Sequence, residues 1–283
     1  MTSSDVQTTR PWSALSQAER DAAYNNRGSI AAADELIAAR QKASRDVADD
    51  FPCHRDVPYG AHPRERWDIF PGSGPEAPCL VFIHGGYWQG GDRKEYSACV
   101  RGTLERGWSA ALCSYPLAPD ASLTEIVDSV SRALGWFSDH RGSFGAGGPL
   151  VLSGWSAGAH LAALLAERDE VKAVLCISGV FELGPVRETF LNAKLCLTDQ
   201  EIESLSPIRL PLVHKPFVVA FGAEELPELQ RQSIEFFQIR NDADMPGHLL
   251  KIPEANHLTV LEELFNTDGR LTVAAEQVLS LVR

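Results

Sequence analysis

The residue with the clearest chemical potential is Ser156, the centre of a G-x-S-x-G motif in which Gly154 and Gly158 flank it. A short apolar run precedes the motif, and a helical pattern begins directly after it. This context predicts a nucleophile elbow, a tight strand-to-helix turn that projects the serine hydroxyl above a sheet. We expect Ser156 to attack a carbonyl carbon, with the N–H of Ala157 at the helix start directed at the developing oxyanion.

A glycine-rich loop follows the apolar run 79–83 and reads His84-Gly85-Gly86-Tyr87-Trp88. Such a loop presents consecutive backbone N–H groups without obstruction, and we expect Gly86 and Tyr87 to supply the second oxyanion donor. His84 and Gly85 are interpreted as a structural motif, in which the imidazole holds the loop by a hydrogen bond. Trp88 is expected to line the entrance with Tyr87, where it either stacks on an aromatic substrate or packs the loop.

A carboxylate and a histidine follow the serine in the order that this kind of site requires. Glu224 and Glu225 lie in the turn after the apolar run 217–221, and the spacing alone leaves the choice between them open. His257 comes after the later run 249–252. If these groups converge, His257 removes the proton of Ser156 and returns it to the leaving group, while the carboxylate orients the imidazole.

The elements that must position these residues alternate along the chain. Strands are expected at 67–70, 79–83, 109–114, 150–153, 173–178, 217–221 and 249–252. Helices are expected at 94–106, 123–140, 157–168, 229–240 and 272–281. Several of the strands are apolar throughout, which is typical of a mostly parallel sheet covered by helices on both faces. In such sheets the active site forms beyond the carboxyl ends of the strands.

The chain of 283 residues fits one α/β domain, residues 1–283, because we find no repeat and no linker. Residues 1–50 read as a helical arm that is too polar to form a core alone. This arm and an insertion at 185–210 interrupt or precede the alternation of strands and helices. We therefore expect both of them to act as a small cap over the site and to set the size of the substrate.

A formal charge of −12 argues against nucleic acid and membrane surfaces as partners. The first residues have no basic segment followed by an apolar one, and no run is long enough to cross a bilayer, so we expect a cytoplasmic protein. The six cysteines are scattered, and the eight histidines lack metal-ligand spacing. No metal and no cofactor is therefore expected. The expected partner is a small-molecule amide or ester, and a homodimer is left open.

Several motifs together resemble the α/β-hydrolase-type arylformamidases, or kynurenine formamidases. The matching segments are His84 to Gln89, Ser156 to Ala163, Ser178 to Leu183, Gly222 to Gln232 and Asn256-His257. The most specific is H-G-G-Y-W-Q, because the related hormone-sensitive-lipase-like esterases usually carry a third glycine where this chain has a tyrosine. The resemblance covers roughly residues 55–283. It implies an α/β-hydrolase fold, a metal-free Ser-acid-His triad, Glu225 as the acid, and hydrolysis of an N-formylkynurenine-like aryl formamide.

Two positions depart from the pattern of that family. The acid is a glutamate where aspartate is more common, and Trp155 stands where histidine commonly precedes the nucleophile. We expect Trp155 to add bulk beside the elbow and, with Trp88, to contact the substrate. The leading hypothesis is an arylformamidase-like amidase that forms an acyl-enzyme on Ser156. The alternative is a carboxylesterase that uses the same triad on short-chain or aryl esters, and a third hypothesis is a binding protein with a lost triad member, although every member is present.

Overall fold

The computed structural model describes residues 11–282, so the first ten residues of the expected N-terminal arm, and the leader prediction that rests on them, lie outside this range. Within it, eight strands form one sheet. They are β1 (His54–Pro58), β2 (Arg66–Phe70), β3 (Cys79–Ile83), β4 (Ser109–Ser114), β5 (Leu150–Trp155), β6 (Val171–Ile177), β7 (Phe217–Gly222) and β8 (Gly247–Ile252).

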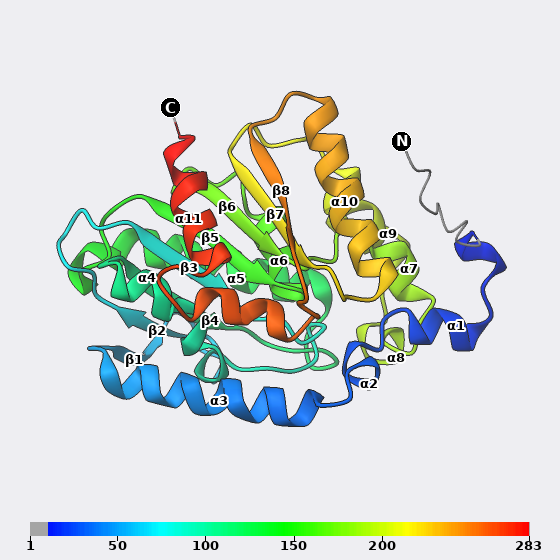
Figure 1. Ribbon diagram of the computed structural model, residues 1–283, viewed down its shortest axis with the longest axis horizontal. Coiled ribbons are helices and arrows are strands. Elements are labelled where there is room, and N and C mark those ends of the chain that lie inside the picture. Colours follow the sequence, from blue (N-terminus) through cyan, green and yellow to red (C-terminus); the bar gives the residue numbers. More distant parts are fainter. Residues whose placement is uncertain (1–10, 283) are drawn as a thin grey trace.

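The order of the strands across the sheet is β1-β2-β4-β3-β5-β6-β7-β8. From β4 to β8 all pairings are parallel, whereas β2 runs antiparallel to both of its neighbours. The predicted mostly parallel α/β sheet is confirmed. Because β3 to β8 point the same way, the loops that follow them emerge at one edge of the sheet (Figure 1).

The central strands are buried on both faces, which explains their unbroken apolar runs. Alternate residues of each strand enter two different hydrophobic clusters. In β3, for example, Val81 and Ile83 join one cluster while Leu80 and Phe82 join the other. The sheet therefore separates two cores, and each is closed by its own layer of helices.

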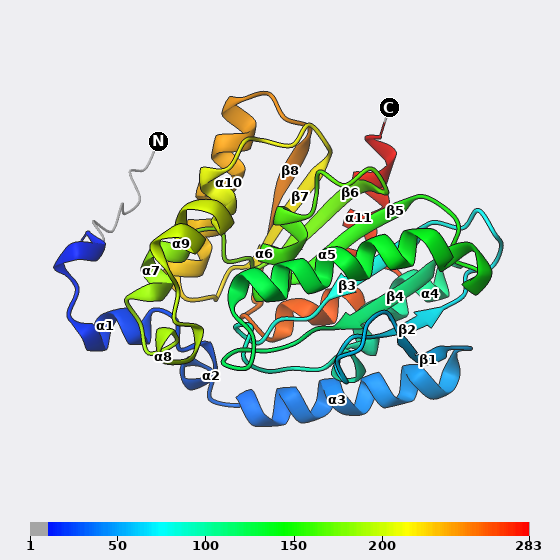
Figure 2. The same cartoon turned by 180° about the vertical axis from the view of Figure 1, so that it is seen from behind.

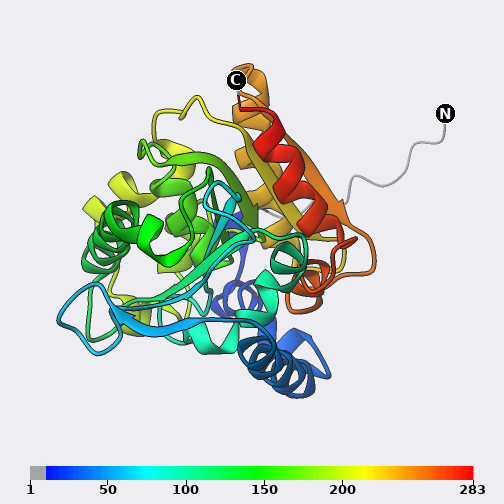
Figure 3. The same ribbon diagram turned by 90° about the vertical axis from the view of Figure 1, so that its left-hand side faces the viewer.

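The helices are α1 (Gln17–Ala22), α2 (Asn26–Ser29), α3 (Ala33–Asp50), α4 (Arg101–Glu105), α5 (Leu123–His140), α6 (Ala157–Leu164), α7 (Leu183–Arg187), α8 (Asn192–Leu195), α9 (Asp199–Leu205), α10 (Pro227–Asp242) and α11 (Arg270–Ser280). The six short 3₁₀ helices in residues 11–282 are η1 (Trp12–Ala14), η2 (Arg93–Glu95), η3 (Ser97–Val100), η4 (Arg141–Phe144), η5 (Pro207–Arg209) and η6 (Thr259–Leu264). Helices α5, α6 and α10 cover one face, and α3, α4, η6 and α11 cover the other (Figures 2 and 3).

Two segments differ from the expected pattern. Strand β1 was not predicted, because this edge strand is mostly exposed and ends in a proline, so it carries no apolar run. The single helix expected at 94–106 is instead η2, η3 and the short α4. Residues 97–100 are all buried there, so packing against the sheet takes precedence over a regular helix.

The N-terminal segment lies against the helices that connect β6 and β7. Helices α1 and α2 run beside α7 and α8 in both views (Figures 1 and 2). Glu188 is the main contact, since Trp12, Gln17 and Arg20 all bind it. The assignment of these segments as a cap stays a prediction. In residues 11–282 no helix is both long and apolar enough to cross a membrane.

Candidate active site

Ser156 occupies the turn between β5 and α6 with φ 56° and ψ −118°, a conformation that side chains rarely adopt. Two contacts hold this backbone. The N–H of Ser156 donates to the carbonyl of Ile177 on β6 at 2.8 Å, and its carbonyl accepts from the N–H of His160 at 3.1 Å. A Cβ on Gly158 would lie 2.0 Å from the carbonyl oxygen of Ile83, so the helix reaches the end of β3 only with glycine there.

The loop after β3 has a strained backbone that frees its amides. Gly86, Tyr87 and Trp88 have φ values of 115°, 51° and 57°. Among residues 11–282, no carbonyl or side chain accepts a hydrogen bond from the N–H of Gly86, Tyr87 or Ala157. Three unpaired amides next to a candidate nucleophile are suited to bind an oxyanion.

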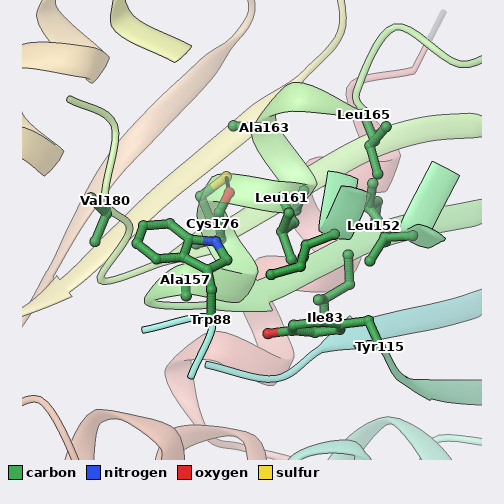
Figure 4. Packing of buried hydrophobic residues seen from close by; sticks show 14 of the residues in the cluster. Ile83, Trp88, Tyr115, Leu152, Ala157, Leu161, Ala163, Leu165, Cys176 and Val180 are labelled. Carbon is green, nitrogen blue, oxygen red and sulfur yellow. Dashed lines mark hydrogen bonds between the residues drawn. The ribbon is translucent and has the colours of Figure 1, made fainter. Parts of the chain in front are cut away.

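Trp88 does not line an entrance, contrary to our expectation. Its side chain has 0% exposure and packs in the core with Ala157 and Val180 (Figure 4). The indole meets the imidazole of His160 edge-on, with ring centroids 4.9 Å apart. The positive φ of Trp88 turns its side chain inward, and this conformation has no signature in the sequence.

His84 lies behind the loop rather than in the site. Its Nδ1 is 2.9 Å from the carbonyl oxygen of Gly85, and its ring stacks on Tyr115 at a centroid distance of 4.4 Å. Burial lowers the pKa of His84 to about 4, so the imidazole is neutral at physiological pH. Gly85 itself lies against the ring of Trp155, which leaves no room for a Cβ.

The structure brings Glu225 and His257 together and leaves Glu224 outside. Nδ1 of His257 donates to Oε2 of Glu225 at 3.0 Å, and both side chains are buried. Glu224 is exposed, although it lies in the same turn after β7. With Ser156 after β5 and His257 after β8, the candidate triad follows the carboxyl ends of parallel strands. An imidazole held by a buried carboxylate is the arrangement of a general base.

Ser178 also contacts the acid, and our reading of the sequence gave it no role. Its Oγ donates to Oε1 of Glu225 at 2.5 Å, and the N–H of Gly222 donates to the same oxygen at 2.7 Å. These two donors leave Oε2 to face the imidazole of His257. Ser178 is the first residue after β6, so its place at a carboxyl end was the signal available.

Trp155 packs against the candidate base. Its indole N–H donates to the backbone carbonyl of His257 at 3.0 Å, and the two rings lie 4.8 Å apart. Only 5% of Trp155 is exposed, so most of its surface contacts protein. A direct contact with substrate stays a prediction for this residue.

The reacting groups themselves are almost closed off, since Ser156 is 2% and His257 is 3% exposed. Charges within such an enclosed site interact more strongly than in water. Within residues 11–282, no group of three or more histidine, cysteine or carboxylate side chains is arranged to hold a metal ion.

A mostly parallel sheet with a serine elbow after its central strand defines the α/β-hydrolase fold. The chain is a serine hydrolase of the esterase and kynurenine formamidase group. The family model described as BD-FAE matches residues 68–208.

The similar proteins support this class over most of the chain. Kynurenine formamidase of Danio rerio is 26% identical over 233 residues, which is 77% of this chain and 78% of that protein. The crystal structure of a protein from Silicibacter sp. TM1040 is 26% identical, with a TM-score of 0.82 over 91% of this chain and 99% of that one. Esterase B of Lactobacillus rhamnosis has the same fold, with a TM-score of 0.72 over 89% and 93% of the chains at 21% identity.

Proposed function

We propose that this protein hydrolyses an aryl formamide or a related amide of the N-formylkynurenine kind, through an acyl-enzyme on Ser156. The observation that carries the proposal is the pairing of His257 with Glu225 at 3.0 Å, close to a serine elbow with free amides. The similarity to kynurenine formamidase over 77% of the chain supports the choice of substrate class.

In the first half of the reaction, His257 takes the proton of the Ser156 hydroxyl as its oxygen attacks the formyl carbon. The negative charge that develops on the carbonyl oxygen is held by the N–H groups of Gly86, Tyr87 and Ala157, and each such donor typically contributes about 3 kcal/mol. His257 then gives its proton to the nitrogen as the C–N bond breaks, and the arylamine leaves.

In the second half, a water molecule attacks the formyl ester of Ser156. His257 takes a proton from this water, and the new tetrahedral intermediate uses the same N–H groups. The bond to the Ser156 oxygen then breaks, and that oxygen recovers its proton from His257. Formate leaves, and the enzyme returns to its starting state.

The enclosed site supports a small acyl group. Trp88 and Val180 pack against Ala157, the residue beside the nucleophile, and both side chains are fully buried (Figure 4). Trp155 fills the space between the elbow and His257. A formyl group is the smallest acyl group, and it places the least demand on such a pocket.

The same triad serves a carboxylesterase, which is the alternative. Because a phenolate or alkoxide leaving group depends less on protonation than an amine, esters are the easier substrates. Weak ester hydrolysis therefore fits both functions, and amide turnover distinguishes them.

The deciding experiment compares purified wild type with Ser156→Ala on N-formyl-L-kynurenine, N-acetyl-L-kynurenine and p-nitrophenyl acetate. We expect Ser156-dependent deformylation with a kcat/KM above about 10⁴ M⁻¹ s⁻¹ and much slower turnover of the acetyl compound. Ester hydrolysis without deformylation would assign the protein to the carboxylesterases instead. Deformylation that persists in Ser156→Ala would overturn the mechanism.

A further inference from the structure

We propose that Asn26, in the N-terminal segment, is a positioning residue for the oxyanion hole and acts through the hydroxyl group of Tyr87. The proposal rests on the serine-hydrolase class of the protein and does not depend on which amide or ester is the substrate. It concerns two segments that are 61 residues apart in sequence and meet beside the site.

The hydroxyl of Tyr87 is bound from both sides by this segment. Nδ2 of Asn26 donates to it at 2.8 Å, and the hydroxyl donates to the backbone carbonyl of Tyr24 at 2.9 Å. Burial and the charge of Glu225 raise the pKa of Tyr87, so the hydroxyl keeps the proton that it donates. Both of its hydrogen-bonding roles are therefore filled by residues 24 and 26.

The anchoring matters because the backbone on either side of Tyr87 is strained. Three consecutive residues, Gly86 to Trp88, have positive φ, and two of them are not glycine. Such conformations cost about 1–3 kcal/mol each and persist only where the surroundings hold them. The ring of Tyr87 is fixed at its far end by Asn26 and Tyr24, so its backbone N–H keeps its direction.

The segment that provides the anchor is itself firmly held. Tyr24 has 0% exposure, and its hydroxyl donates to Oε1 of Glu228 at 3.1 Å while it accepts from Nε2 of Gln232 at 2.7 Å. Oε1 of Gln232 in turn accepts from the N–H of Phe181 at 2.7 Å, in the loop after β6. The N-terminal segment thus ties the oxyanion loop to the loops after β6 and β7.

Asn26 is a poor choice for stability alone. It is 6% exposed, and its Oδ1 has no hydrogen-bond partner among residues 11–282. A buried, unpaired amide oxygen costs free energy, so replacing the side chain by alanine relieves one cost while it loses one contact. The remaining contribution of Asn26 is its hydrogen bond to Tyr87.

The test compares Asn26→Ala, Tyr87→Phe and the double variant with wild type. Arg27→Ala is the matched control, since Arg27 is on the same turn but its side chain is 71% exposed and pairs with Asp34. Two readouts are used, namely kcat for p-nitrophenyl acetate and the rate at which a p-nitrophenyl phosphonate labels Ser156, measured by intact mass. The phosphonyl oxygen probes the oxyanion hole directly and needs no knowledge of the natural substrate.

Complete loss of one oxyanion donor lowers kcat by about 10²–10³, so a displaced donor should lower it by about tenfold. We expect that loss in each single variant, in both readouts, with little change in KM or melting temperature. The double variant should be no slower than the singles, because both changes break one contact. Additive losses, a change in KM alone, an unchanged Asn26→Ala, or an equal loss in Arg27→Ala would each overturn the proposal. Failure of N-formylkynurenine as a substrate would affect only the proposed function.

Discussion

The indole N–H of Trp155 donates a 3.0 Å hydrogen bond to the backbone carbonyl of His257. The residue immediately before the candidate nucleophile therefore holds the loop that carries the candidate base. The rings of the two residues also pack at 4.8 Å, and the other side of the indole contacts Gly85 at the start of the oxyanion loop. One side chain thus sets the spacing between the groups that must act on the same substrate.

Replacing Trp155 by phenylalanine keeps an aromatic ring but removes the donor to His257. A hydrogen bond of this kind contributes about 1 kcal/mol, so kcat should fall about fivefold. Steady-state kinetics on the best substrate measure the effect. Trp136→Phe, on the outer helix α5, is the control and should retain wild-type kcat. A change confined to KM would indicate that Trp155 binds substrate and does not position the base.

The two neighbouring glutamates should differ sharply when each is changed to glutamine. Glu225→Gln removes the charge that faces His257 and permits the wrong imidazole tautomer, so kcat should fall about 10³- to 10⁴-fold. Glu224→Gln, at an exposed position, should leave kcat within twofold. Comparable activity of the two variants would show that Glu225 is not the acid.

Two glycines of the oxyanion loop form a matched pair for testing its shape. A Cβ on Gly86 would lie 2.4 Å from the carbonyl oxygen of Gly90, at a φ of 115° that disfavours side chains, whereas a Cβ on Gly90 would meet only one atom, at 4.0 Å. Gly86→Ala should therefore displace the amides and lower kcat at least about tenfold, while Gly90→Ala is tolerated. Rates of phosphonylation at Ser156 report on the same geometry, and equal rates would contradict it.

Buried His160 should make the fold sensitive to acid. Burial lowers its pKa from 6.5 to about 4, and its Nε2 lies 2.7 Å from the carbonyl oxygen of Leu205. Between pH 6.5 and 4 the unfolded chain binds a proton that the folded chain does not, so the free energy of unfolding falls as the pH falls through this window. At pH 5 the cost is about 2 kcal/mol for one such histidine.

Urea unfolding of His160→Gln at pH 7 and pH 5 measures that contribution. Glutamine does not titrate, so the difference between the two pH values should shrink by about 2 kcal/mol relative to wild type. The remainder includes the similar contribution of His84. His54→Gln, at an exposed strand position, is the surface control. An unchanged difference in His160→Gln would show that this histidine is protonated in the folded state at pH 5.

Local patterns were sufficient for most of the sheet and for the elements around Ser156. The bounds of β3 and β4 match the apolar runs, because a strand buried on both faces needs an apolar side chain at each position. The exposed edge strand β1 has no such requirement and left no pattern. Helix α5 matches as well, since it has a capping box at Ser122 and a regular apolar stripe.

The sequence by itself determined the chemistry, because a G-x-S-x-G turn, a glycine-rich loop and a late histidine each follow an apolar run and need only local context. Tertiary structure decided which glutamate faces His257, that Ser178 braces it, and that Trp88 turns into the core while Asn26 reaches Tyr87. These are contacts between segments distant in sequence, or rotations of a side chain by a single backbone angle. Neither kind has a periodicity that a one-dimensional pattern can carry, and both are fixed only when the two faces of the sheet pack.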